Sequence, residues 1–234
     1  MKRIFTFCLL SLLCAAGARA QNIDLNRSVN WIFGNMSGFR FMGYADSVGG
    51  NELRLIQPYY GFVNKEGVTS ISNRAGKLLF YSDGSNVYDG THQRMTNGDQ
   101  LNGSFSATQG CLPIPMPGHP NLYYLFTTCH RNAGPGIQYT VIDMSLKGGR
   151  GDIVELNHDL DCIAEEKLAA VQHANGLDYW VVTRKFHTNK MYAFLVTAEG
   201  VQAPVVTEIG VAEPGAPGFG MDWDWEAVRH YGHS

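Results

Sequence analysis

Hydrophobic residues gather in short runs that end in Ser or Thr and recur at long intervals. The runs are rich in Leu, Val and aromatic residues, which favour β-strands, and they comprise residues 78–82, 123–127 and 179–183. Aligning Tyr81 with Phe126 and Val182 gives offsets of 126 − 81 = 45 and 182 − 126 = 56 residues. Periods of this length indicate structural repeats.

Further strand-like segments surround each run, with Gly- and Asn-containing turns between them. The expected turns are residues 73–76, 117–121 and 174–176. The preceding strands are residues 68–72, 109–114 and 168–173, and the following strands are residues 86–88, 137–143 and 190–197. A fourth strand is expected in the last two units, at residues 152–156 and 201–208.

Four antiparallel strands in roughly 40 to 50 residues make up one blade of a β-propeller. The sequence therefore predicts an all-β fold, a partial β-propeller of about three four-stranded antiparallel blades plus an incomplete one. A β-sandwich also uses short strands but carries no such internal repeat. Residues 67–210 form the blades, and the irregular segment 21–66 holds strands of a partial blade at residues 30–33 and 38–42. Residues 211–234 are expected to be a loop and tail that begin a truncated blade.

Composition supports a globular chain and disfavours one class of partner. Hydrophobic residues make up 44% of the 234 residues and charged residues 17%, which excludes an intrinsically disordered chain. Aromatics at 12% and 27 glycines fit short strands joined by tight turns. The net charge of −3 argues against nucleic acid as a partner.

Residues 1–20 have the pattern of a secretory signal peptide. Lys2 and Arg3 precede an apolar run at residues 4–13, and Ala18-Arg19-Ala20 fits the small-x-small cleavage rule. The mature chain is then expected to begin at Gln21. The apolar run is shorter than the roughly 20 residues of a membrane-spanning helix. These features predict a secreted protein, extracellular or on the outer cell surface, with the periplasm as the alternative, and no membrane span.

Three cysteines remain after cleavage, Cys111, Cys129 and Cys162. An odd number at wide spacing argues against a disulfide framework. Burial of all three as small hydrophobic residues is the favoured interpretation. A single bridge between Cys111 and Cys129 stays open as the alternative.

Candidate chemistry is sparse. Asp83-Gly84-Ser85-Asn86 followed by Asp89-Gly90 is rich in oxygen ligands for Ca²⁺, but two hairpin turns explain it more simply. Asp159, Asp161, Glu165 and Glu166 are interpreted as neighbouring acids on a solvated loop. No catalytic, cofactor-binding or metal-binding residue is assigned, no cofactor is expected, and the chain is predicted not to be an enzyme.

Three surface motifs have competing interpretations. Arg150-Gly151-Asp152 spells an integrin-binding tripeptide, although turn chemistry explains it better. Asp46-Ser47-Val48 resembles a bacterial O-glycosylation acceptor and also fits an ordinary turn. Trp223 and Trp225 alternate with acidic residues, as in a half-buried strand or an exposed aromatic patch.

Four segments together resemble a known family. They are LLFYSDG (78–84), HPNLYYLFT (119–127), YTVIDMSLKGGRGDI (139–153) and EKLAAVQHANGLDYWVVT (166–183). They are similar to the amino-terminal propeller of large, gliding motility-associated cell-surface proteins exported by the type IX secretion system, over residues 31–210. The resemblance implies a propeller fold and an outer-surface location, and it implies no catalytic residues. The family's later modules and sorting domain have no counterpart here.

These features favour a binding or adhesion module for an unknown surface glycan or protein. The alternatives are a truncated remnant of a larger surface protein and, less favoured, a polysaccharide-active enzyme. An open arc of blades would leave apolar faces uncovered at its ends. Self-association is therefore expected through the faces near Trp31 and near Val205.

Overall fold

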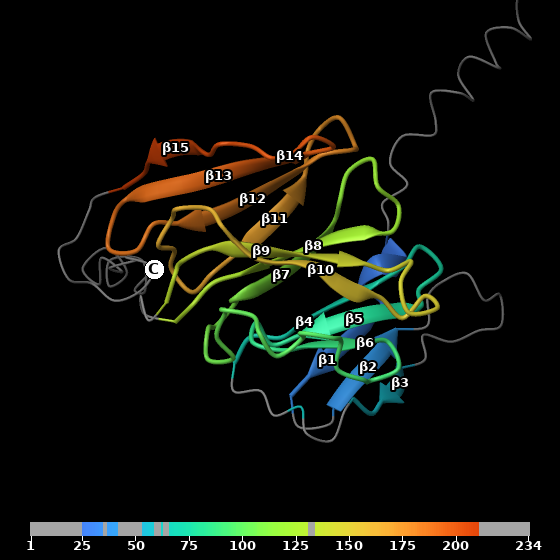
Figure 1. The fold of residues 1–234 in the computed structure, drawn as a ribbon. Coiled ribbons are helices and arrows are strands. Elements are labelled where there is room, and N and C mark those ends of the chain that lie inside the picture. Colours follow the sequence, from blue (N-terminus) through green and yellow to red (C-terminus); the bar gives the residue numbers. More distant parts are fainter. Residues whose placement is uncertain are drawn as a thin grey trace, which may run out of the picture.

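The protein is built from four small antiparallel β-sheets that follow one another along the chain (Figure 1). The computed structural model describes residues 25–34, 37–41, 53–58, 62, 66–130 and 134–210. Within these residues the only helical element is the 3₁₀ turn η1 (Leu25–Ser28), and there is no α-helix. The prediction of an all-β fold is confirmed.

Within each sheet, strands pair with their chain neighbours, except that β15 pairs with β13. The first sheet contains β1 (Asn30–Phe33), β2 (Ser37–Phe41) and β3 (Leu53–Ile56), and the second contains β4 (Thr69–Ser72), β5 (Leu78–Ser82) and β6 (Val87–Asp89). The third contains β7 (Cys111–Pro115), β8 (Leu122–Thr127), β9 (Gln138–Asp143) and β10 (Asp152–Asp159). The fourth contains β11 (Ala169–Gln172), β12 (Tyr179–Arg184), β13 (Lys190–Thr197), β14 (Gly200–Val201) and β15 (Val205–Glu208).

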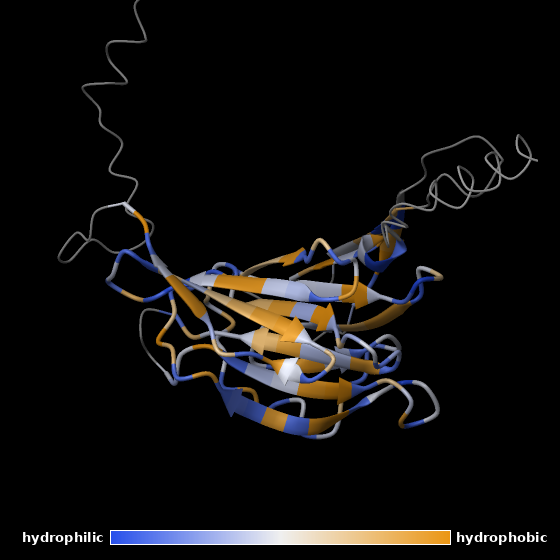
Figure 2. Ribbon diagram, turned by 90° about the horizontal axis from the view of Figure 1, so that it is seen from above, coloured by the Kyte–Doolittle hydropathy of each residue, from blue (hydrophilic) through white to orange (hydrophobic). Residues whose placement is uncertain are grey.

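Successive sheets stack face to face, and each interface has an apolar core of its own. Figure 1 shows the fourth sheet at the top, the third in the middle and the first two at the bottom. Strand β8 contributes to two cores, because Tyr123 and Leu125 pack toward the second sheet while Tyr124 and Phe126 pack toward the fourth. This explains why β8 is apolar on both faces, and Figure 2 shows hydrophobic segments throughout the stacked strands.

The first strands of successive sheets are neighbours, and hydrogen bonds join them or the residues just before them. The Ser70 hydroxyl donates to the Asn30 carbonyl at 2.6 Å, which ties β4 to β1. The remaining links are backbone bonds from Gly67 N to Ala107 O (3.2 Å), Gln109 N to Glu166 O (3.0 Å) and Leu168 N to Gln109 O (3.1 Å). The four sheets thus meet along one line of first strands.

The third sheet has the predicted four antiparallel strands, whereas the number of strands in the second and fourth sheets differs from four. The second sheet has three strands, because residues after β6 turn back without forming a fourth. The backbone of the following loop pairs instead with the outer edge of β6. Val87 N donates to Gly98 O (2.7 Å), and Met95 N donates to Val87 O (3.0 Å). The first sheet contains β3, which the sequence analysis missed.

The single strand predicted at residues 201–208 is divided into β14 and β15, which both pair with β13. Pro204 lies in the interruption and has no backbone N–H to donate to a ladder. Gln202 N bonds Leu195 O at 2.8 Å and keeps the interruption attached to β13. The other predicted strands form within a few residues of their expected bounds.

Several predictions concern residues outside the described part of the chain. These are the signal peptide at residues 1–20, the motif Asp46-Ser47-Val48, the tail 211–234, and Trp223 and Trp225 within that tail. Among the residues that are described, no helix has the length and apolar character needed to cross a membrane.

Candidate functional site

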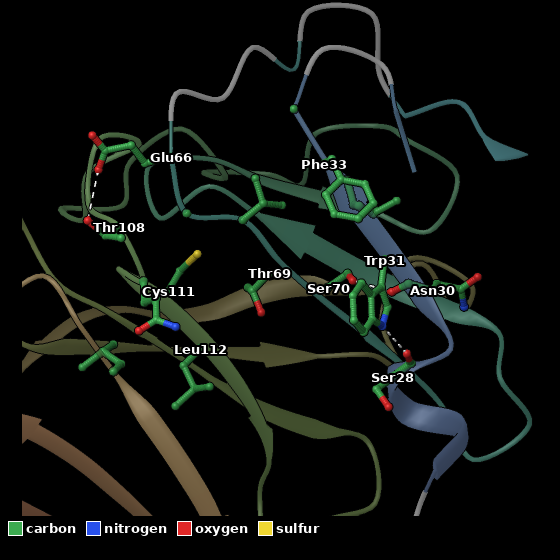
Figure 3. Close-up of a pocket in the computed structure, with 16 residues that line it drawn as sticks. Ser28, Asn30, Trp31, Phe33, Glu66, Thr69, Ser70, Thr108, Cys111 and Leu112 are labelled. Atoms are coloured by element: carbon green, nitrogen blue, oxygen red, sulfur yellow. Dashed lines mark hydrogen bonds between the residues drawn. The ribbon is translucent and has the colours of Figure 1, made fainter. Parts of the chain in front are cut away.

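A hollow of about 510 Å³ opens where the first strands of the sheets meet (Figure 3). Residues of β1, β4 and β7 line it, together with the segments just before β4, β7 and β11. Three sheets therefore contribute strands to its wall, and the fourth contributes Leu168. We call this feature the first-strand hollow.

Strand β1 supplies an aromatic wall. Its residues alternate between buried and exposed, so Asn30 and Ile32 face the second sheet while Trp31 and Phe33 are 49% and 40% exposed. The indole N–H of Trp31 donates to the Ser28 carbonyl at 2.8 Å, a bond visible in Figure 3. The remaining interaction surface of the indole is its apolar ring face.

A buried polar network holds β1 against β4. The side-chain amide of Asn30, which is 2% exposed, donates to the Ser72 hydroxyl at 2.7 Å and to the Gly76 carbonyl at 2.9 Å. The backbone carbonyl of Asn30 accepts the bond from Ser70. Since buried polar groups of this kind are satisfied in only one arrangement, the network fixes where the aromatic wall stands.

Carboxylates lie on the opposite side of the first-strand hollow. The Thr108 hydroxyl lies 3.4 Å from Glu66 Oε2 and 3.1 Å from Glu166 Oε2, and Figure 3 shows its contact with Glu66. Thr108 has one hydroxyl proton and can donate it to one carboxylate at a time. The rim is therefore rich in acceptor oxygens.

Cys111 also borders the hollow, but its thiol is not poised to react. Its Sγ donates to the Ser82 carbonyl at 3.4 Å, and burial raises the pKa of the Cys111 thiol well above its ordinary value. Burial likewise raises the pKa of Cys129 and of Cys162. All three cysteines are free and buried, so the favoured interpretation is confirmed and the Cys111–Cys129 bridge is not formed.

The oxygen-rich string after β5 serves the backbone. Asp83 Oδ1 accepts from Ser85 N (2.9 Å) and Asn86 N (2.7 Å), and Asp89 Oδ1 accepts from Thr91 N (2.8 Å). These bonds are those of side-chain-capped turns, as the simpler interpretation predicted. No group of three or more His, Cys, Asp or Glu side chains in the described part of the chain could hold a metal ion.

The four acids expected on a solvated loop have different surroundings. Asp159 and Asp161 are exposed, and Asp159 Oδ1 accepts from Asp161 N at 2.8 Å. Glu165, however, is 7% exposed, with Oε1 accepting from His187 N at 3.4 Å. The prediction was wrong for Glu165 because its neighbours Cys162, Ala164 and Leu168 pack into the core between the third and fourth sheets. Glu166 contacts Thr108, which borders the first-strand hollow.

The Arg150-Gly151-Asp152 motif is held by contacts within the chain. Arg150 Nη1 lies 3.5 Å from Asp89 Oδ2, and Asp152 Oδ2 lies 3.5 Å from Lys147 Nζ with its side chain only 13% exposed. Gly151 has φ +84°, which fits the turn interpretation. The motif lies apart from the first-strand hollow.

Sequence reasoning assigned none of the residues around this hollow. Glu66 and Thr108 are separated by 42 residues, and Thr108 and Glu166 by 58. Their only signal in the sequence is their position just before the first strand of a unit. Comparison of the chain with protein-family models, curated proteins and solved structures gives no match.

Proposed function

We propose that the four sheets are part of a β-propeller and that the chain is a secreted or cell-surface binding module. The support for the propeller is the succession of sheets in chain order, with a separate core at each interface and the first strands along one line. In propellers the inner strands surround a central channel. The first-strand hollow corresponds to one side of such a channel. The outer-surface location rests on residues 1–20 and on the family resemblance.

The ligand we propose is a carbohydrate, and the observation that carries this proposal is the composition of the first-strand hollow. A sugar ring has an apolar face of C–H groups that stacks on an exposed aromatic ring such as Trp31. Its hydroxyls donate hydrogen bonds to acceptors such as the carboxylates beside Thr108. An aromatic wall opposite a rim of acceptor oxygens matches both halves of this chemistry.

The charge of the chain selects among carbohydrates. Glu66 lines the hollow, Glu166 lies beside it in contact with Thr108, and the net charge is −3, so anionic polysaccharides are repelled. We therefore propose a neutral saccharide. The module is proposed to bind this saccharide without turnover.

Retention on insoluble polysaccharides tests the proposal. The purified chain is incubated with cellulose, xylan, starch and chitin, and soluble oligosaccharides of the retained type are then titrated by calorimetry. Trp31→Ala and Glu66→Gln should each weaken binding about tenfold, or about 1.4 kcal/mol. Val154→Ala, on β10 and outside the hollow, should bind as the wild type does.

Three results would overturn the proposal. Absence of retention on all four polysaccharides would show that the ligand is not a carbohydrate of this kind. Wild-type affinity in the Trp31 and Glu66 variants would show that the saccharide does not bind in the hollow. Release of shortened saccharides during incubation would show an enzyme in place of a binding module.

A further inference from the structure

The first sheet exposes an aromatic face at one end of the stack. Strand partners lie on the same face of a sheet, and the register pairs Trp31 with Phe39 and Phe39 with Leu55. Leu55 is 80% exposed and Phe41 is 40% exposed. The Trp31 ring meets that of Phe41 with centroids 5.2 Å apart, so the face is a continuous aromatic surface. We call it the first-sheet face.

The fourth sheet exposes an apolar face at the other end of the stack. Its inner face carries Val181 and Phe194, which are buried against the third sheet. The residues between them point the other way, and the register aligns Val171 with Trp180 and Leu195, and Val182 with Ala193 and Val205. Val171 is 61% exposed and Val205 is 56% exposed. We call this the fourth-sheet face.

We propose that a second copy of this chain covers both faces, the first-sheet face of each copy packing on the fourth-sheet face of the other. The inference rests on the arrangement of sheets proposed above. The part of the first-sheet face that the second copy covers is formed by Phe39, Phe41 and Leu55, which do not line the hollow, so Trp31 stays available to a ligand. The result is a closed dimer in which four sheets from each chain form a ring of 4 + 4 = 8.

The stacking inside the chain is the first argument for a second copy. At three successive interfaces, one face of a sheet packs against the opposite face of the sheet that follows it in the chain. The fourth-sheet face is the one such face with no following sheet among the described residues, and the first-sheet face is the one with no preceding sheet. Joining them between copies repeats a contact that the chain makes three times.

Side-chain size is the second argument. The covered part of the first-sheet face carries Phe39, Phe41 and Leu55, which are all large. The fourth-sheet face includes the smaller Ala193, Val182 and Val205 beside its larger residues. Facing large residues against small ones lets two layers interdigitate, whereas two aromatic faces brought together would crowd.

Closure is the third argument. A contact between two different faces generates either a ring or an open filament. Propeller rings contain roughly four to eight sheets, and two copies of this chain reach the upper limit while three would exceed it. The same closure would complete the first-strand hollow, because β1 of one copy would lie next to β11 of the other around the ring axis.

The oligomeric state of the full chain tests the proposal. Size-exclusion chromatography with light scattering, over a wide range of protein concentration, should give twice the mass of the single chain. Leu55→Lys blocks the first-sheet face and Val171→Lys blocks the fourth-sheet face, because burying an unpaired ammonium is strongly unfavourable. Each variant alone should be monomeric. Val154→Lys, 48% exposed on β10, is the matched control and should remain dimeric.

Mixing the two monomeric variants is the decisive step. One retains an intact first-sheet face and the other an intact fourth-sheet face, so the mixture should form dimers through the single remaining contact. Thermal unfolding of each variant checks that it is folded, and Phe41→Lys and Val205→Lys are second substitutions on the same two faces.

Four outcomes would overturn the proposal. A wild-type monomer is expected if residues 211–234 of the same chain cover a face. A Val171→Lys dimer beside a Leu55→Lys monomer would show two first-sheet faces packed together. Mass that grows without limit would indicate a filament, and a mixture that stays monomeric would exclude contact between the two different faces.

Discussion

Gly136 lies where the loop before β9 passes the segment that leads to β11. Its φ is +90°, and a Cβ at this position would overlap the backbone carbonyl of Cys162. The neighbouring Ile137 N donates to that same carbonyl at 2.9 Å, so the carbonyl cannot move away without losing a hydrogen bond. Both the left-handed backbone conformation and the lack of space for a Cβ therefore favour glycine at position 136.

Gly136→Ala should lower the free energy of unfolding by about 2 to 4 kcal/mol, from left-handed strain plus overpacking. Gly176→Ala is the matched control, because Gly176 has φ +73° but no atom within 4 Å of its added Cβ. Its loss should be about 1 kcal/mol from conformation alone. Urea unfolding measures both, and equal losses would contradict the close approach at Cys162.

Burial of Cys162 makes stability depend on pH in the alkaline range. Burial raises the pKa of the thiol from 9.0 to about 11, with Lys185 opposing the shift. The folded state holds the proton more tightly than the unfolded state, so the contribution is complete below about pH 9 and is lost as pH rises toward about 11.

The melting temperature should therefore fall between pH 8 and pH 10.5, and it should fall less in Cys162→Ala. The variant is compared with itself at the two pH values, so any loss of packing at neutral pH cancels. Tyr124, whose pKa burial raises to about 12, supplies a smaller loss in both proteins. An identical fall in the two proteins would show that Cys162 is not protected from ionisation.

At the residue scale the sequence predicted the burial of the cysteines but not the members of the first-strand hollow. A free cysteine behaves as a small hydrophobic residue, so burial is its expected environment in a globular chain. Glu66, Thr108 and Glu166 carry only the signal of their position just before the first strand of a unit, which does not show which side chains they contact. What brings them together is hydrogen bonding between the starts of different units, which local patterns do not encode.

At the element scale, every described strand except β3 was predicted, and β14 and β15 were predicted as a single strand. Strands β5, β8 and β12 are buried or half-buried along their lengths, so their sequences are continuous apolar runs. The missed strand β3 has only four residues, one of them Arg54, so its apolar run is short. The division between β14 and β15 occurs at Pro204, which cannot donate a hydrogen bond to the sheet. A prediction from the strand propensities of residues 201–208 does not include this effect.

The turn after β5 gives a test of turn chemistry against metal binding. Asp83→Ala removes the acceptor for two backbone N–H groups and should lower the free energy of unfolding by about 1 to 3 kcal/mol. Asp83→Asn keeps an acceptor oxygen and should lose less.

Calcium serves as the control for the same turn. Neither added Ca²⁺ nor a chelator should change the melting temperature of the wild type, because Asp83 Oδ1 is engaged by Ser85 and Asn86. A melting temperature that rises with Ca²⁺ concentration would show binding to the folded state and contradict this account.

At the scale of the whole molecule, the repeat predicted the succession of sheets but not how they meet. The offsets between units indicated similar structures in sequence, and four antiparallel sheets in chain order are what the structure contains. The contact between first strands depends on tertiary hydrogen bonds from Gly67, Gln109 and Leu168. Both the hollow and the two exposed end faces follow from that contact.

The central claim is that first strands of successive sheets are neighbours around one hollow, and an engineered disulfide tests it most directly. Gln109 and Lys167 are parallel bridge partners just before β7 and β11, so Gln109→Cys with Lys167→Cys should form a disulfide under mild oxidation. The native thiols should not interfere, because burial raises their pKa values. Peptide mapping by mass spectrometry should find the 109–167 link in most molecules, and no link in the control Gln109→Cys with Val154→Cys. Absence of the 109–167 link, or equal linking in the control, would contradict the arrangement on which the hollow and its proposed function rest.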